Sequence, residues 1–204
     1  MDSDAAEPPG LQARKKLAAM HRIQDAALDL FEERGFDDVA IETVAAAAEV
    51  SPRTVYRYFG SKEMLVIWDE EDEFTLSPLT DQFAGADPIG ALREALRAGF
   101  AAMSDADLRL IRRRVALIYR HPAIEAALIL HAYEKSRAIV AAVPERGDRL
   151  ETQVFVHAFI GGALGAIRHW CLNGFAEHPY ECIDRALTLL EHGFTDPRKR
   201  ATPP

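Results

Sequence analysis

The positions of apolar residues predict a chain made of helices. Apolar residues recur three and four positions apart over most of its length, whereas the strict alternation typical of a half-buried strand is absent. This pattern predicts an all-α protein with about nine helices and no strand. The expected helices cover residues 14–34, 41–48, 52–59, 62–73, 88–104, 106–120, 122–142, 149–173 and 179–193.

Several of these helices have recognisable ends. Ser51 and Asp87 each precede a proline, so each can cap a helix whose first position is that proline. Ser61 is expected to cap the fourth helix in the same way. The compositions of residues 1–13 and 196–204 indicate a disordered leader and a disordered tail.

Residues 44–59 have the form of two short helices that meet across a tight turn. Val44, Ala45 and Ala48 supply the buried side of the first helix, and their small size lets the two helices cross closely. Val50 is placed to fill the turn. The segment therefore predicts a helix-turn-helix.

The second helix of this pair has two chemically different faces. At about 100° per residue, Val55 and Phe59 lie on one side and the hydrogen-bond donors lie on the other. Such a helix can enter a DNA major groove with its apolar back against its own domain. An ordinary surface helix usually mixes charges of both signs, but this one has no acidic residue, so we interpret it as a recognition helix. The donor-bearing residues are Arg53, Thr54, Tyr56, Arg57 and Tyr58.

The overall charge argues against DNA binding until its distribution is considered. The formal net charge is −8, and acidic residues outnumber basic ones both before and after residue 62. Residues 51–62, however, contain Arg53, Arg57 and Lys62 and no acid. Because phosphate attraction acts over about 8–10 Å, this local basic face can bind DNA on an acidic protein.

The composition is that of an ordinary globular protein, with 49% hydrophobic and 27% charged residues. No run of about 18 apolar residues occurs, so no membrane partner is expected. Residues 1–10 are acidic and are not expected to be a signal peptide. The chain has 2 cysteines, which give no disulfide framework and fit a reducing cytoplasm.

Four segments near the N-terminus carry a resemblance to a known family. They read AALDLFEERGF at 26–36, VA at 44–45, VSPRTVYRYF at 50–59 and SKE at 61–63. Through them, residues 17–65 resemble the DNA-binding domain of the tetracycline-repressor (TetR) family. The resemblance implies a homodimeric transcriptional regulator, usually a repressor, which a small ligand releases from a palindromic DNA operator.

The expected domains follow from this resemblance and from the helix pattern. We expect a DNA-binding domain at residues 14–65, containing a three-helix unit with the helix-turn-helix. A larger helical domain for ligand binding and dimerisation is expected at residues 66–195. The runner-up hypothesis is a lipid or acyl-CoA carrier, or a helical enzyme, with no role in DNA binding.

The resemblance also implies roles for single residues. Arg53 would face base edges, and Lys62 would hold a phosphate from the start of the fourth helix. Thr54, Tyr56 and Tyr58 would bind phosphates.

Two positions depart from the family pattern. Ala40 stands where the family often has a capping Ser or Thr, and Glu49 stands where it usually has a Gly in the turn. Glu49 is expected to adopt a left-handed conformation at modest cost, unless the turn itself differs. Thr43 is the candidate to replace a phosphate contact at position 40. The expected DNA-binding residues are Thr43, Arg53, Thr54, Tyr56, Arg57, Tyr58 and Lys62.

Residues 89–195 resemble, more loosely, the C-terminal domain of mycofactocin-type TetR regulators. The matching stretches are LIRRRVALIYRHP at 110–122 and AIRHW at 166–170. The resemblance implies a hydrophobic ligand of the acyl-CoA type. Some of the large apolar residues of this part are expected to line a cavity, although most apolar stripes at helical spacing are simply core. The candidate ligand-binding residues are Phe100, Met103, Val115, Ile118, Tyr119, Tyr133 and His157.

The last two expected helices carry candidate dimer-forming stripes. The first has a strip of small residues that lets another helix approach closely, and the second has an apolar stripe. Packed against a second copy they would form a four-helix bundle. The alternative is that both stripes are satisfied inside one subunit. The candidate interface residues are Gly161, Gly162, Gly165, Ile183, Leu187 and Leu190.

Other candidate sites are weaker. His169 and Cys171 lie two positions apart on a helix, roughly 200° around it, so they cannot converge on one metal ion. No catalytic motif occurs, and neither an enzyme nor a cofactor is expected. Arg14–Lys16 precede the expected start of the first helix or lie at it, where they are equally typical of a basic arm for a minor groove and of a solvated helix start.

Overall fold

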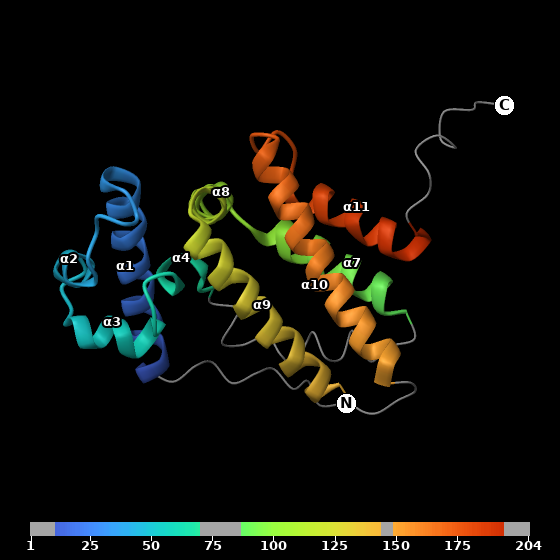
Figure 1. Ribbon diagram of the computed structural model, residues 1–204, viewed down its shortest axis with the longest axis horizontal. Coiled ribbons are helices and arrows are strands. Elements are labelled where there is room, and N and C mark those ends of the chain that lie inside the picture. The colour runs from blue at the N-terminus through green and yellow to red at the C-terminus, as the bar shows by residue number, and fades with distance from the viewer. Residues whose placement is uncertain (1–10, 70–86, 144–148, 194–204) are drawn as a thin grey trace. The chain divides into compact units, whose positions relative to one another are not determined.

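The structure is helical in every part that it describes. The computed structural model describes residues 11–69, 87–143 and 149–193, and in these ranges it contains nine helices and no strand (Figure 1). The all-α prediction is confirmed. The helices are α1 (Leu11–Arg34), α2 (Ile41–Ala47), α3 (Pro52–Phe59), α4 (Met64–Ile67), α7 (Pro88–Ala102), α8 (Asp105–Arg120), α9 (Pro122–Ala142), α10 (Arg149–Leu172) and α11 (Pro179–His192).

The chain divides into two compact units, residues 1–70 and residues 71–204. The first unit contains α1 to α4, and the second contains α7 to α11. The division lies a few residues after the domain boundary expected at residue 65, so that α4 belongs wholly to the first unit.

The core of the first unit is built on one face of α1. Met20, Ile23 and Leu28 are completely buried there. The polar side chain of Gln24 is buried among them, and it donates a hydrogen bond of 2.8 Å to the backbone carbonyl of Trp68. This bond satisfies a buried amide and ties α1 to the residue that follows α4.

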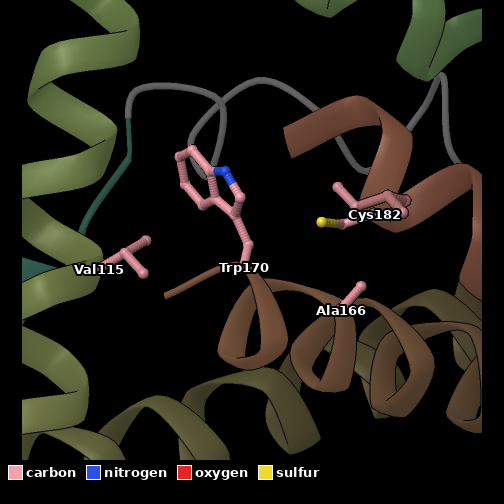
Figure 2. Close-up of a cluster of buried hydrophobic side chains, with 5 residues drawn as sticks. Val115, Ala166, Trp170 and Cys182 are labelled. Atoms are coloured by element: carbon pink, nitrogen blue, oxygen red, sulfur yellow. The ribbon is translucent and has the colours of Figure 1, made fainter. Parts of the chain in front are cut away.

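The core of the second unit is built around α10, which contacts α8, α9 and α11 (Figure 1). Figure 2 shows its main cluster, in which Trp170 and Ala166 of α10 lie with Val115 of α8 and Cys182 of α11. The Trp170 indole N–H donates to the Glu177 carbonyl at 2.7 Å, so this large side chain is buried without an unsatisfied donor.

Two predicted boundaries need correction. α1 begins at Leu11, so residues 11–13 are helical and do not belong to the expected leader. The fourth helix starts at Met64 rather than Lys62, and it ends at Ile67 instead of running on to residue 73. It ends there because Trp68 turns to extended backbone, with φ −54° and ψ 136°, and its side chain is buried against the unit.

Some predictions fall on residues that the structure does not describe. Residues 1–10 of the expected leader, residues 70–73 of the expected fourth helix and the expected tail all lie outside the described residues.

Candidate nucleic-acid interface

The turn between α2 and α3 is closed by a Schellman motif. The Val50 N–H donates to the Ala45 carbonyl at 2.9 Å, and the Glu49 N–H donates to the Ala46 carbonyl at 3.2 Å. Glu49 occupies the left-handed position of this motif with φ 56°. The turn therefore has its usual geometry, although Glu49 stands in place of glycine. Of the two alternatives expected for this position, a left-handed residue and a different turn, the structure shows the left-handed residue.

The start of α2 lacks a side-chain cap. Ala40 is its N-cap residue, in extended backbone, and no side chain there accepts a hydrogen bond. Thr43 lies in the first turn of α2 and is half-buried. The helix thus begins without the polar side chain that the family often places at this point.

The start of α3 is capped as the sequence predicts. The Ser51 hydroxyl oxygen accepts from the Thr54 N–H at 3.1 Å, and Pro52 occupies the first helical position. The two hydroxyl groups of Ser51 and Thr54 are also hydrogen-bonded, with their oxygens 2.9 Å apart. The Thr54 side chain is therefore held against the helix start.

The two faces predicted for α3 are present. Val55 and Phe59 are buried in the first unit, at 0% and 5% exposure. Arg53, Tyr56 and Arg57 are exposed. The helix is thus anchored by its apolar side and presents charged and phenolic donors on the other, as a helix in a major groove must.

Arg57 and Tyr58 form a pair on this face. The Arg57 guanidinium carbon lies 4.9 Å from the centre of the Tyr58 ring, and its Nη2 donates to the Tyr58 hydroxyl at 3.3 Å. Tyr58 itself is half-buried. Stacking on the phenol restricts the guanidinium, so the cation is already positioned before any ligand binds.

Lys62 has a partner within its own unit. Its ammonium group donates a hydrogen bond to the Phe36 carbonyl and lies 4.4 Å from the centre of the Phe36 ring. It lies 5.6 Å from the ring of Phe31 as well. An ammonium group has three donors, so a phosphate contact remains compatible with this position. Lys62 nevertheless also joins the start of α4 to the end of α1.

Arg14, Lys15 and Lys16 lie within α1. A basic arm and a solvated helix start were the two alternatives expected for these three residues. Their backbone is part of the helix, as in the second alternative. Arg14 and Lys15 are exposed, whereas Lys16 is half-buried.

The structure brings only some of the candidate ligand-binding residues together, since Phe100 and Tyr119 pack against the cluster that contains Val115. Val115 and Ile118 are buried in the core, and Phe100 and Met103 are half-buried. Tyr133 is 53% exposed. His157 is exposed beside it, with the two ring centres 5.9 Å apart, so this pair lies on the surface of the second unit.

Tyr119 has a structural role in the second unit. Its hydroxyl donates to the Leu164 carbonyl at 3.2 Å, which links α8 to α10. The guanidinium of Arg168 lies 5.3 Å from the centre of its ring. Burial, with a smaller contribution from the Glu125 carboxylate, raises the pKa of Tyr119 to about 12.

The candidate dimer residues divide into two groups. Gly162, Gly165 and Leu190 line an apolar groove of about 620 Å³ between α10 and α11, and Gly161 is exposed near it on α10. Ile183 and Leu187 are instead buried within the subunit, at 6% and 1% exposure. Their expected place in an interface is therefore corrected, because the stripe that they form on α11 packs against the subunit's own core.

The groove has further walls beside the candidate interface residues. They lie on the neighbouring positions of α11, which share the three-and-four spacing of the groove-lining Leu190, and on the last turns of α10. Ala166, His169 and Ala186 of these walls belong to the two stripes recognised in the sequence, whereas Cys182, Arg185 and Leu189 do not. Among the described residues, no three His, Cys, Asp or Glu side chains converge as they would around a metal ion.

A helix-turn-helix with a donor-bearing second helix, joined to a separate helical unit, defines a class of protein: the DNA-binding transcriptional regulators. Comparison with known proteins identifies the family. Residues 23–67 match the family model of bacterial regulatory proteins of the tetR family, and residues 86–195 match the MftR C-terminal domain. The chain belongs to the TetR family, which confirms the resemblance inferred from its sequence.

Two proteins with similar sequences are also named as transcriptional regulators. The HTH-type transcriptional regulator TcmR of Streptomyces glaucescens is 30% identical over 177 residues, which cover 81% of this chain and 78% of TcmR. The mycofactocin biosynthesis transcriptional regulator MftR of Mycobacterium tuberculosis is 29% identical over 165 residues, or 77% of this chain and 82% of MftR.

Two solved structures share the fold. One is SmeT, the repressor of the Stenotrophomonas maltophilia efflux pump SmeDEF, with a TM-score of 0.52 and 21% identity over 84% of this chain and 89% of SmeT. The other is NalD, the secondary repressor of the pump MexAB-OprM in Pseudomonas aeruginosa, with a TM-score of 0.51 and 20% identity over 88% of this chain and 97% of NalD.

Proposed function

We propose that this protein is a ligand-responsive repressor that binds a palindromic operator as a homodimer in the cytoplasm. A small hydrophobic ligand releases it from the DNA. The observation that carries the proposal is α3, which is fixed by the buried Val55 and Phe59 and exposes Arg53, Tyr56 and Arg57. A helix that exposes only donors and no carboxylate suits a groove lined by phosphates and base acceptors.

Contacts with bases and contacts with phosphates have different roles in this proposal. Arg53, at the exposed start of α3, reads base edges, as the N-terminal residues of recognition helices do. Tyr56 and Tyr58 bind phosphates, which fix the register of the helix. The remaining proposed phosphate contacts come from Thr43, Thr54 and Lys62.

The dimer is proposed to form through α10 and α11. An 18-residue window of α10 has a mean hydropathy of 1.3, and only 17% of it is buried within the subunit. By length and composition alone, this helix could also cross a membrane. That is weak evidence, because core helices of soluble proteins pass the same test. In a DNA-binding regulator, an exposed apolar helix is better explained by a second copy that covers it.

The exposed positions of α10 fit that arrangement. Leu150, Val154 and Leu172 are 63%, 59% and 73% exposed, and they share a helix face with Gly161 and Gly165. At both glycines an added Cβ would meet nothing within 4 Å. The space above them is open in one subunit and is available to a helix of another.

The ligand is proposed to act on the second unit, which matches the MftR C-terminal domain. Half-buried apolar side chains surround its main cluster, among them Leu96, Phe100 and Ile111. Side chains that are only partly packed can move apart around an apolar ligand, so that a pocket opens on binding. A ligand bound there would alter how α8 and α10 pack.

A gel shift tests the proposal. DNA from upstream of the protein's own gene is titrated at two salt concentrations, beside a shuffled duplex of equal length. We expect a specific complex whose affinity falls steeply as salt rises, because bound phosphates release counterions. Equal binding to both duplexes, or no binding at low salt, would instead favour the carrier or enzyme hypothesis.

A further inference from the structure

We propose that the start of α1 and the end of α3 together form a clamp for one DNA backbone phosphate, with Lys15, Lys16 and Arg57 as its cations. The clamp rests on the proposed function and adds to it. It gives the first helix a direct part in DNA binding, and it gives Arg57 a role different from that of Arg53.

A pocket joins these residues. It measures about 400 Å³, and its walls come from the first turns of α1 and from the last turn of α3. Both helices belong to the first unit. Three of the lining residues are cationic and none is acidic. The lining residues are Gln12, Ala13, Lys15, Lys16, Arg57 and Tyr58.

The charge of the pocket points to an anion. An anion in this pocket would lie near three cationic side chains and would be attracted by each of them. On this protein the contrast is sharp, because the whole chain carries a net charge of −8. A phosphate diester is the anion that the neighbouring recognition helix brings within reach.

Arg57 is held for this role by Tyr58. Its Nη2 donates to the Tyr58 hydroxyl at 3.3 Å, so the phenol acts as acceptor and keeps its own proton free to donate to a phosphate oxygen. The stacked guanidinium loses less side-chain freedom on binding than an extended arginine would. Tyr58 is thus both a support for Arg57 and a donor in the pocket.

The position of the pocket indicates the role of a phosphate bound in it. Arg57 lies one helical turn after Arg53 on α3, and it lines a pocket shared with α1. A phosphate held there would lie beside the groove that Arg53 reads. Contacts of this kind fix the register of the protein on DNA and carry no base information.

The test uses the full-length protein and the DNA segment that it protects upstream of its own gene. The variant Lys15→Ala/Lys16→Ala is compared with Arg22→Ala/Arg34→Ala, which removes two cations from exposed positions of the same helix that do not line the pocket. Circular dichroism confirms that each variant is folded.

For Lys15→Ala/Lys16→Ala we expect the slope of log affinity against log salt to fall by about one per half-site. Ethylation of one phosphate per half-site, which blocks the wild type, should weaken this variant much less, since only Arg57 and Tyr58 remain to hold that phosphate. Preference among base-substituted duplexes should stay unchanged, and the Arg22→Ala/Arg34→Ala control should keep the wild-type slope and ethylation pattern.

A wild-type slope and ethylation pattern in Lys15→Ala/Lys16→Ala would overturn the clamp and leave the proposed function standing. An equal change in the control would also overturn it, since general charge would then explain the effect. A wild-type protein that binds no duplex would overturn the proposed function and the clamp together.

Discussion

At the scale of single residues, the backbone of Glu49 in the helix-turn-helix is slightly strained. The turn needs a residue with positive φ, and a side chain there costs roughly 1–2 kcal/mol relative to ordinary backbone. Glycine avoids this cost but loses more freedom on folding. The sequence predicts the strain because the turn between two short helices is recognisable from its flanking residues.

Glu49→Gly should therefore raise the free energy of unfolding, by about 0.5–1 kcal/mol. Chemical denaturation of the wild type and the variant measures the difference. Glu63→Gly is the matched control, since Glu63 has φ −62° and gains nothing from glycine. If both variants were destabilised alike, the backbone at position 49 would not be strained.

Lys62 shows a limit of prediction from sequence at this scale. The motif indicates a basic residue near the DNA, but it does not indicate that the same ammonium group bonds to the Phe36 carbonyl. That contact joins residues 26 positions apart and depends on how α1 and α4 pack. The roles of such residues follow from tertiary structure.

At the scale of elements, helix starts were predicted well where a capping residue is followed by proline, but not at Ser61, after which α4 starts only at Met64. Ser51 and Asp87 cap α3 and α7 as expected, because an N-cap side chain and a following proline act locally. The end of α4 was not predicted. Its cause is the burial of Trp68, a tertiary contact that the helical pattern of the sequence does not indicate.

The start of α2 offers an element-scale prediction. Ala40 is an N-cap with no side-chain hydrogen bond, so Ala40→Ser should stabilise the first unit by about 1 kcal/mol. Thermal denaturation measures this. Ala46→Ser, at an exposed position inside α2, should instead lose a few tenths of a kcal/mol. Equal effects at both positions would contradict a specific capping gain.

A second prediction concerns the attachment of α7 to α11. The Arg93 guanidinium donates to Asp184 at 2.6 Å, to Glu191 at 3.2 Å and to Thr188 at 3.3 Å. Arg93→Ala should lower the free energy of unfolding by about 1 kcal/mol, and less in high salt, because the network is only partly shielded from water.

Arg97→Ala is the control for that network. Arg97 is exposed and pairs with Glu94 of the same helix, so its removal should leave stability almost unchanged. Urea titrations at low and high salt compare the two variants. A loss from Arg93→Ala no larger than that from Arg97→Ala would show that the network does not hold α7 to α11.

At the scale of the whole molecule, the sequence predicts the family and the two kinds of unit, but only part of the proposed interface. Small residues on α10 were recognised from their spacing. Ile183 and Leu187 were misassigned because an apolar stripe does not say whether it packs on its own subunit or on another. Of the candidate ligand residues, Phe100, Val115 and Tyr119 lie at one cluster, whereas Tyr133 and His157 lie on the surface.

Dimer formation can be tested at a position that spares the subunit itself. An added Cβ at Gly162 would meet Leu190 Cδ1 at 3.3 Å, whereas Gly165 has open space. Gly165→Glu should therefore give folded monomers with weak operator binding. Sedimentation at micromolar concentration measures the mass. Gly99→Glu, at an equally open glycine of α7, should remain dimeric, and dimers in both variants would contradict the proposed interface.

Base substitution in the operator shows whether α3 reads a DNA sequence. The affinity of the wild type and of Arg53→Ala is measured for duplexes carrying each base pair in turn at every operator position, at one fixed salt concentration. We expect Arg53→Ala to lose about 1–3 kcal/mol of binding free energy on the preferred duplex and to lose its base preference at one position of each half-site. If Arg53→Ala kept every base preference of the wild type, Arg53 would not read a base and α3 would not be the recognition helix proposed here.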